Sequence, residues 1–430
     1  MSSRAMFLAA LAYGLVLFGL ASMKSASLIL AIPLLVYLIL ALRQTPDRPT
    51  LRLERIAPGE AAVEGDLLPI TLTIHNEGDR DLAKLHVCEQ LPPGSVVESG
   101  QTELLTSLPA GESTEISYTL AAQRGAFDLA AVAVSVWDGL GVMAWSGEIE
   151  VATHLTVTPR YQPLRSLAIR PLRTKGFSGP LASRQSGSGS DFFGVREYQM
   201  GDPLRRINWR AAARHHEQLF TNEFEQERIA DIGLILDMRS EHVFRIGPDS
   251  LLDHAVRATA ALADSLLQDG HRVGLLLYGF GLDGVLPGYG KGQRDRIMRK
   301  LAEARPVSSQ VFRSLKYLPT RVFPARAQLI FVSPLSDNDE TVLFRLRAHG
   351  YGVLVISPNS VEFEAQLLPD EPLRALAIRL ARAERRIFLR RLRQGGIITV
   401  DWPVDRPLDD LIQITLRQTP PPHGRIGRPL

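Results

Sequence analysis

Two apolar runs close to the start of the chain constrain its fold more than any other feature. They cover residues 5–21 and 26–42 and are separated by a short polar turn. Each run holds about 17 residues and as a helix would be about 25 Å long, close to the thickness of the hydrocarbon core of a bilayer. We therefore expect a transmembrane hairpin over residues 1–48, with helices at about 5–22 and 26–42.

The basic residues around this hairpin predict its orientation. One arginine precedes it, only Lys24 lies in its turn, and a group of arginines follows it. The flanking arginines are Arg4, Arg43, Arg48, Arg52 and Arg55. Because basic residues accumulate on the cytoplasmic side of membrane helices, we expect both termini in the cytoplasm rather than an outside N-terminus with one re-entrant stretch. The second apolar run disfavours a cleaved signal peptide, which is the other alternative.

Length and composition indicate globular domains in addition to this membrane part. At 430 residues, with 45% hydrophobic and 22% charged residues, the chain is long enough for two or three domains with separate cores. The formal net charge is only +3, so no nucleic-acid partner is expected. The single cysteine, Cys88, excludes an intrachain disulfide framework and a cysteine-based zinc cluster, in agreement with a reducing compartment.

Residues 49–160 have the pattern of a β-rich module. Short runs of alternating apolar and polar residues, such as LPITLTIHN and DLAAVAVSVWD, are separated by turns rich in Gly, Pro, Asn and Asp. A period of two residues is typical of half-buried strands, and turns at intervals of about ten to fifteen residues are typical of an antiparallel sandwich. We predict an immunoglobulin-like β-sandwich here.

After residue 230 the pattern changes to apolar strands that alternate with amphipathic helices. The runs IGLILD, VGLLLYG, QLIFVSP, GVLVIS and IITVDW are typical of buried parallel strands. The alternation predicts a doubly wound α/β domain over residues 231–415, followed by a flexible Pro- and Gly-rich tail over 416–430. Ligands of such sheets bind at the carboxyl ends of the strands.

Residues 161–230 connect the two domains and contain the densest motif of the chain. Up to about residue 190 the segment is rich in Arg, Ser and Gly, which predicts a linker or exposed loop. Neither its GSG nor the later PGYGKGQ completes a phosphate-binding loop, so nucleotide hydrolysis is not supported. The motif follows as SDFFGVREYQMGDPLRRINWRAAARHHEQLFTNEFEQE.

This motif resembles the signature of the family called domain of unknown function 58. The matching residues are Arg196, Tyr198, Gly201, Asp202, Arg206, Ile207, Trp209, Ala213 and Arg214, and Asn208 stands where the family usually has Asp. The resemblance extends over nearly the whole chain. It implies a bacterial inner-membrane protein with cytoplasmic soluble domains, a von Willebrand factor A-like fold for the last domain, and a MoxR-type AAA+ ATPase as partner.

Residues of this motif could bind a ligand or hold the segment together. The arginines alternate with acidic residues, which favours internal ion pairs over a phosphate site. Trp209 is expected to pin the segment by packing against arginines rather than to stack on a base. His215 and His216 are adjacent in sequence, point in different directions on a helix, and make a poor chelating pair.

The first strand of the α/β domain ends at Asp237, where functional von Willebrand factor A domains begin an Asp-x-Ser-x-Ser magnesium site. Arg239 and Glu241 occupy the two serine positions here, and a guanidinium repels a metal ion. Asp337 or Asp339 could replace the family's later aspartate ligand. We expect no metal or cofactor, with Mg²⁺ as the alternative, and an ion pair between Arg239 and Asp237.

The strand ends are instead predicted to form a surface that binds a partner. Its residues are Asp237, Arg239, Glu241 and Ser333, with Gly279 close by. A basic helix is predicted farther along, with Leu376, Leu380, Ala383 and Ile387 at the spacing of a buried face. The basic side of this helix is either solvated, which an interspersed glutamate favours, or in contact with anionic lipid.

Together these features favour a membrane-anchored, non-catalytic adaptor acting with a MoxR-type AAA+ ATPase in the assembly or maturation of a protein complex. A metal-dependent hydrolytic enzyme that uses Asp237, Glu241 and Asp337 is the alternative, although no nucleophile and base have a recognisable spacing. A third hypothesis is a structural envelope protein whose β-module binds the partner.

Overall fold

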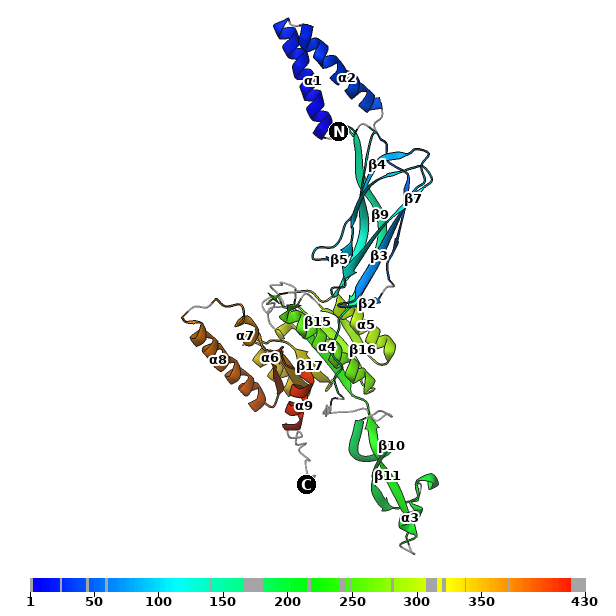
Figure 1. Cartoon of the computed structure of the whole chain (residues 1–430). Helices are drawn as coiled ribbons and strands as arrows, with labels where there is room; N and C mark the ends of the chain where they lie inside the picture. Colours follow the sequence, from blue (N-terminus) through cyan, green and yellow to red (C-terminus); the bar gives the residue numbers. More distant parts are fainter. Residues whose placement is uncertain are drawn as a thin grey trace. The chain divides into compact units, whose positions relative to one another are not determined.

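Two compact units, Met1–Thr158 and Pro159–Leu430, make up the computed structural model of the chain (Figure 1). The structure describes residues 3–23, 25–43, 46–58, 61–139, 141–165, 167, 181–200, 202–214, 218–239, 245–247, 249–279, 282–306, 315–318, 322–336, 338–369 and 372–418.

The first unit begins with a helical hairpin at the predicted place. α1 (Ser3–Ser22) and α2 (Ser25–Arg43) pack against each other. Both are long and apolar enough to cross a membrane. The buried positions of the hairpin carry small residues, which allow close approach of two helices. These residues are Ala5, Ala12, Gly19, Ala31 and Ala41. The two apolar helices are therefore confirmed, and their insertion in a membrane stays a prediction.

The rest of the first unit is a module of two β-sheets with a common core. The first sheet has the order β1 (Leu51–Ile56), β3 (Leu67–Asn76), β7 (Ser113–Ala121), β5 (Val96–Gly100). The second has the order β2 (Ala61–Val63), β9 (Ala144–Thr158), β8 (Gly125–Trp137), β4 (Leu82–Glu89), β6 (Glu103–Leu108). The predicted alternation is present along β3, where Leu68, Ile70, Leu72 and Ile74 are buried against residues of the second sheet.

The β-module also buries an ion pair that the sequence did not predict. Arg55 donates to both carboxylate oxygens of Glu89, at 3.0 and 2.8 Å, and neither side chain is exposed. Its Nη1 donates to the carbonyls of Leu129 and Val151, at 2.7 and 2.5 Å. A buried charge is tolerated only when it is paired and hydrogen-bonded. Arg55, one of the arginines that flank the hairpin in sequence, therefore belongs to the core of the folded module.

The second unit begins with residues that pack onto the α/β domain. Tyr161, Leu164 and Leu167 contact its larger core. The Arg165 side chain donates to Asp410 at 2.7 Å. Residues 161–165 form no helix or strand, in agreement with the predicted loop. A few apolar side chains spaced along the segment nevertheless fasten it to the core of the domain.

A two-stranded ribbon follows, formed by β10 (Leu181–Glu197) and β11 (Phe220–Arg228) in antiparallel pairing. The prediction of a loop up to residue 190 is wrong for residues 181–190, which belong to β10. The Ser- and Gly-rich sequence gives little sign of a strand, but pairing with β11 supplies the backbone hydrogen bonds that a strand needs.

A six-stranded sheet forms the centre of the α/β domain. Its order is β16 (Leu282–Gly288), β15 (Arg272–Tyr278), β12 (Asp231–Asp237), β17 (Gln328–Val332), β18 (Gly352–Pro358), β19 (Ile398–Trp402). Neighbouring strands are parallel except β16, which is antiparallel to β15. The five predicted strands are present. The edge strand β16 was missed because Gly284 and Pro287 interrupt its apolar pattern.

Helices cover both faces of this sheet (Figure 1). One core joins the sheet to α4 (Leu251–Gln268), α5 (Lys291–Ala302) and α9 (Leu408–Gln418). A second core joins it to α6 (Asp339–Ala348) and α8 (Arg374–Gln394). The smaller elements are β13 (Arg245–Ile246), β14 (Asp249–Ser250), η3 (Leu315–Tyr317) and α7 (Ser360–Glu364). The predicted doubly wound arrangement is therefore present.

Two helices differ from the prediction. The face of α8 that was expected to be buried is exposed, with Leu376, Leu380 and Ile387 at 59%, 59% and 53% exposure. α8 contacts the core through Leu389 and Leu392 instead. α9 carries the domain to Gln418, beyond the predicted end at residue 415, and the remainder of the predicted tail lies outside the described residues.

Candidate functional site

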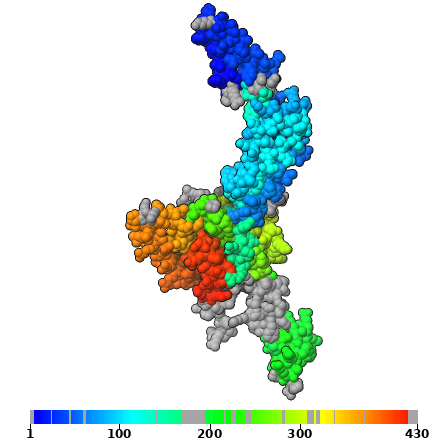
Figure 2. All heavy atoms as spheres, in the orientation of Figure 1, coloured from blue at the N-terminus to red at the C-terminus, as the bar shows by residue number. Residues whose placement is uncertain are grey.

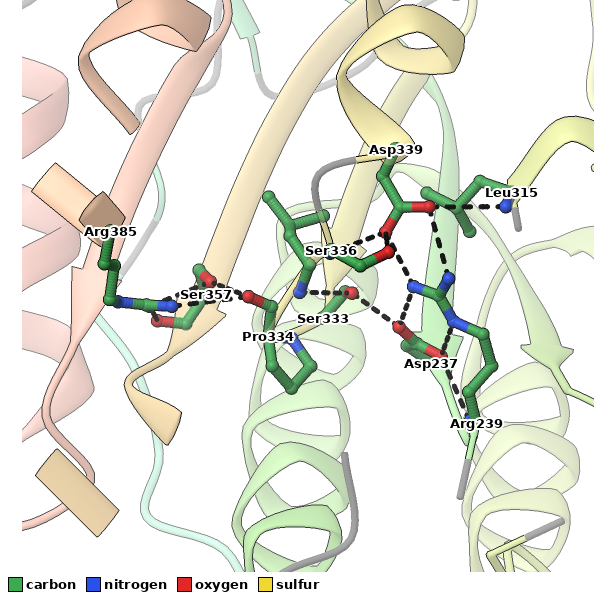
Figure 3. A network of polar contacts seen from close by, with 10 residues as sticks. Asp237, Arg239, Leu315, Ser333, Pro334, Ser336, Asp339, Ser357 and Arg385 are labelled. Atoms are coloured by element: carbon green, nitrogen blue, oxygen red, sulfur yellow. Dashed lines mark hydrogen bonds and ion pairs between the residues drawn. The ribbon is translucent and has the colours of Figure 1, made fainter. Parts of the chain in front are cut away.

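Polar side chains gather at the carboxyl ends of β12 and β17, which are neighbours in the sheet (Figure 3). Asp237 is the last residue of β12, and Arg239 follows two positions later. Ser333 follows β17, and Asp339 is the first residue of α6. This sheet edge is where doubly wound folds bind their ligands.

Arg239 lies between two carboxylates. Its Nε and Nη2 donate to Asp237 at 2.8 and 2.6 Å. Its Nη1 and Nη2 donate to Asp339 at 3.2 and 2.7 Å. The expected ion pair of Arg239 with Asp237 is confirmed. Asp339, which the sequence suggested only as a replacement metal ligand, is the second partner of the guanidinium.

Hydroxyl and amide donors complete this network (Figure 3). The Ser333 hydroxyl donates to Asp237 at 2.6 Å and accepts from the Leu335 amide at 3.0 Å. The Ser336 amide and hydroxyl donate to Asp339 at 2.9 and 3.2 Å. Each carboxylate therefore has neutral donors as well as the guanidinium, as buried charges require.

Burial makes this network a fixed part of the fold. Asp237, Arg239 and Asp339 are 4%, 3% and 0% exposed. Burial by itself lowers the pKa of Arg239, but hydrogen bonds and charge from Asp237 and Asp339 outweigh it and raise that pKa above its usual value. The guanidinium thus stays charged. Both carboxylates are engaged by it and are not disposed to hold a metal ion or to act as a general base.

A second arginine ties the neighbouring loops together (Figure 3). Arg385 of α8 donates to the Ser357 carbonyl and hydroxyl, at 3.1 and 3.0 Å, and to Asp401 at 2.9 Å. It also donates to the Pro334 carbonyl at 3.3 Å. Because Pro334 follows Ser333, this arginine links α8 to the loop of the first network.

The predicted partner-binding residues do not themselves form a surface. Asp237 and Arg239 are buried, and Ser333 is only 1% exposed, so a partner would meet the residues that cover them. Glu241 and Asp337 lie outside the described residues. Within the part of the chain that the structure describes, no three His, Cys, Asp or Glu side chains are grouped as in a metal site.

The signature forms the end of the β10–β11 ribbon. The connection between the strands contains the 3₁₀ helix η1 (Leu204–Arg206) and the short helix α3 (Trp209–Ala212). A backbone hydrogen bond of 2.7 Å from the Tyr198 amide to the Leu219 carbonyl closes it. We call residues 198–214 the signature tip.

Several signature residues hold this tip together. Arg196 donates to both oxygens of Asp202 at 2.8 and 2.7 Å, which confirms internal ion pairing for these two residues. These hydrogen bonds lower the pKa of Asp202 below its usual value. The Tyr198 hydroxyl donates to the Asp202 carbonyl at 3.4 Å. Asn208 caps α3 by accepting from the Ala211 amide at 2.9 Å.

Other signature residues face outward. Trp209 is 68% exposed, so the expected role in pinning the tip is wrong. Met200 and Leu204 are also exposed, at 102% and 71%. The same segment contains three exposed arginines that have no ion pair with a described carboxylate. They are Arg205, Arg210 and Arg214. Gly201, His215 and His216 lie outside the described residues.

The fold and the buried network define a multidomain α/β protein with an N-terminal apolar hairpin. Residues 194–373 match the model of the family described as protein of unknown function DUF58. It is similar to the "Uncharacterized protein YeaD" of Bacillus subtilis (strain 168), with 30% identity over 219 residues, 50% of this chain and 52% of that protein. The chain therefore spans about half the length of this curated relative.

Parts of the chain also resemble solved structures, at low identity. The structure of Escherichia coli alpha-2-macroglobulin from domain MG7 to the C-terminus is 16% identical, with coverage of 32% of this chain and 24% of that chain and a TM-score of 0.21. The FixG-related protein from Vibrio parahaemolyticus is 11% identical, with coverage of 26% and 98% and a TM-score of 0.18. Similarities this distant carry no information about function.

Proposed function

We propose that this protein is a membrane-anchored, non-catalytic adaptor that binds a MoxR-type AAA+ ATPase and acts in the assembly or maturation of a protein complex. The signature tip carries the proposal, because it exposes large apolar side chains beside arginines at the end of a ribbon. The hairpin would be the anchor in the inner membrane, with the soluble domains in the cytoplasm. The ATPase is the partner that the family resemblance implies.

The chemistry of the tip fits a protein partner. Leu204 and Trp209 together with Met200 expose apolar surface that gains free energy when a partner covers it. Tryptophan and arginine are the side chains most enriched at binding hot spots. The adjacent arginines favour a partner whose apolar cleft has an acidic rim.

We also propose a finer fold assignment for each of the two soluble domains. A sheet with one antiparallel edge strand and Asp237 at the end of its first strand supports a von Willebrand factor A-like α/β domain. The two sheets with a common core support an immunoglobulin-like β-module. In such a domain, Arg239 would occupy the position at which functional von Willebrand factor A domains hold Mg²⁺. Binding of the ATPase would then not depend on a metal ion.

A hydrolytic enzyme is less well supported. It would need Asp237 to bind a metal ion or activate water together with Glu241 and Asp337. Asp237 instead accepts hydrogen bonds from Arg239 and Ser333 and is buried. A carboxylate whose oxygens are occupied in this way is poorly placed for either role.

Binding to a purified MoxR-type ATPase encoded in the same genome tests the adaptor proposal. The full chain in lipid nanodiscs is compared with the variants Trp209→Ala and Leu204→Ala. We expect each to weaken binding by about tenfold or more, as for residues at the centre of an interface. Leu286→Ala on β16 is the matched control, since Leu286 is 72% exposed, and it should leave the affinity unchanged.

Other outcomes separate the competing hypotheses. Unchanged affinity in both tip variants contradicts the proposed contact. Loss of binding on deletion of residues 50–160, with intact binding in the tip variants, supports the β-module as the binding part. Turnover of a phosphoester or peptide that disappears in a folded Asp237→Asn variant supports the enzyme.

A further inference from the structure

α8 carries an apolar stripe that no element among the described residues covers. The exposed residues are Leu373, just before the helix, and Leu376, Leu380 and Ile387 within it, at 70%, 59%, 59% and 53% exposure. Spacings of three, four and seven residues place them on one face of a helix. Figure 2 shows this segment in orange at the surface of the second unit.

Arginines predominate among the charged residues of α8. The sequence of α8, RALAIRLARAERRIFLRRLRQ, contains a single acidic residue, Glu384, among its arginines. Some arginines are held by the fold, such as Arg382, which donates to both oxygens of Glu362 at 2.6 and 2.7 Å. Others are exposed and have no ion pair with any described residue. They are Arg379, Arg386, Arg390 and Arg391.

The exposed arginines lie next to the leucines rather than opposite them. At about 100° per residue, Arg379, Arg386 and Arg390 form one edge of the apolar stripe. Arginine side chains can lay their carbon stems along apolar surface while the guanidinium reaches a negative charge. An apolar stripe with such an edge is typical of helices that lie in the headgroup region of a membrane.

We infer that the outer face of α8 binds the surface of a bilayer that contains anionic lipid. The leucines and Ile387 enter the boundary between headgroups and acyl chains, and the arginines at the edge of the stripe contact lipid phosphates. α8 is already ordered by its contacts with the sheet and by the Arg385 network, so binding needs no folding of the helix.

Charge and composition favour lipid over the other occupants of such a face. A second copy of the chain in a symmetric contact would bring the same arginines against one another, which is repulsive. The face is aliphatic and has no aromatic anchor, unlike the signature tip with Trp209. The chain also carries two helices apolar enough to cross a membrane, and insertion of these would hold α8 at high local concentration of lipid.

Quenching of a fluorescent label on α8 by a quencher attached to the lipid tests the inference. The full chain has one cysteine, so Cys88→Ser gives a background in which Ala383→Cys places a label within the stripe. Ala348→Cys on α6 is the matched control, since Ala348 is also exposed. Each protein is reconstituted in vesicles of phosphatidylglycerol and phosphatidylcholine, or of phosphatidylcholine alone, with a quencher attached near the lipid headgroup.

We expect strong quenching at position 383 in the anionic vesicles, little in the neutral ones, and little at position 348 in either. Changing Arg379, Arg386 and Arg390 to glutamine should lower the equilibrium constant for binding of α8 to the bilayer surface by about a hundredfold, at about fivefold for each arginine. Glutamine at three other exposed arginines of this unit, Arg296, Arg299 and Arg345, should have little effect.

Three outcomes would overturn the inference. The first is an unquenched label at position 383 in anionic vesicles. The second is equal quenching at positions 383 and 348, which indicates unspecific contact. The third is energy transfer between labels at position 383 of two chains without lipid quenching, which indicates contact between copies.

Discussion

Replacing Arg239 by leucine should destabilise the α/β domain by about 3–5 kcal/mol, the usual cost of removing one partner from a buried ion pair. The change removes four hydrogen bonds to two carboxylates. It leaves Asp237 and Asp339 buried without their cation, and this unpaired charge outweighs the lost hydrogen bonds. The leucine side chain refills part of the volume, so a cavity contributes little.

Hydrogen exchange of the full chain measures this effect for each unit separately. Amides of β12 and β17 should exchange faster by a factor of about 10² to 4 × 10³, the equivalent of this free energy when exchange follows opening of the domain. The strands of the β-module are the internal control, and their protection should not change.

A combined variant distinguishes unpaired charge from lost packing. Adding Asp237→Asn and Asp339→Asn to Arg239→Leu removes the two charges that the single change leaves buried. Most of the lost protection should return, because a buried network replaced by neutral groups of similar volume is often as stable as the original. Loss of less than about 1 kcal/mol in the single variant, or a further loss in the combined one, would refute the reasoning.

Three further predictions concern single side chains. Asn208→Ala should destabilise the signature tip by about 1 kcal/mol through loss of the α3 cap, seen as faster exchange of the Ala211 amide. Hydrogen bonds with Arg196 lower the pKa of Asp202. The contribution of Asp202 to stability is therefore present above about pH 4 and is lost below it. Hydrogen exchange of amides in the signature tip should become faster below about pH 4, and less so in Asp202→Asn. Burial lowers the pKa of His271, whose ring nitrogens have no hydrogen-bond partner among the described residues. Because this histidine takes up a proton in the unfolded chain at a higher pH than in the folded one, the stability of the protein declines below about pH 6.5. The melting temperature of His271→Leu should not show this decline.

The sequence predicts the fold well where an apolar pattern has a clear period. The hairpin, the alternation along β3 and the parallel strands were all visible in this way. β10 and β16 were missed because strand formation there depends on pairing with β11 and β15 rather than on side chains. α8 shows a different limit. Its sequence has apolar residues on two sides, and only the packing decides that Leu389 and Leu392 face the sheet while Leu380 faces solvent.

The candidate site was predicted only in part, for a reason of distance along the chain. Arg239 and Asp237 are two residues apart, so opposite charge at the end of one strand was enough to suggest their ion pair. Asp339 is 100 residues away from Arg239, and its place depends on where α6 begins relative to β17. The same holds for Arg55 and Glu89, which meet because β1 and β4 belong to facing sheets. The sequence shows which residues are charged but not which of them come into contact in the fold.

In the proposed von Willebrand factor A-like domain, the guanidinium of Arg239 would occupy the place of the magnesium ion, and a charge fixed in the chain cannot dissociate. Millimolar Mg²⁺ should therefore leave the stability of the unaltered protein unchanged. Arg239→Ser would remove the guanidinium and add a hydroxyl near Asp237, Ser333 and Asp339, a set of hard oxygen ligands suited to Mg²⁺. This variant should be less stable than the parent, and its melting temperature should rise with Mg²⁺ concentration. Adding Asp339→Asn should abolish that rise. Equal stabilisation of both proteins by Mg²⁺, or of neither, would show that the guanidinium does not occupy the place of a cation.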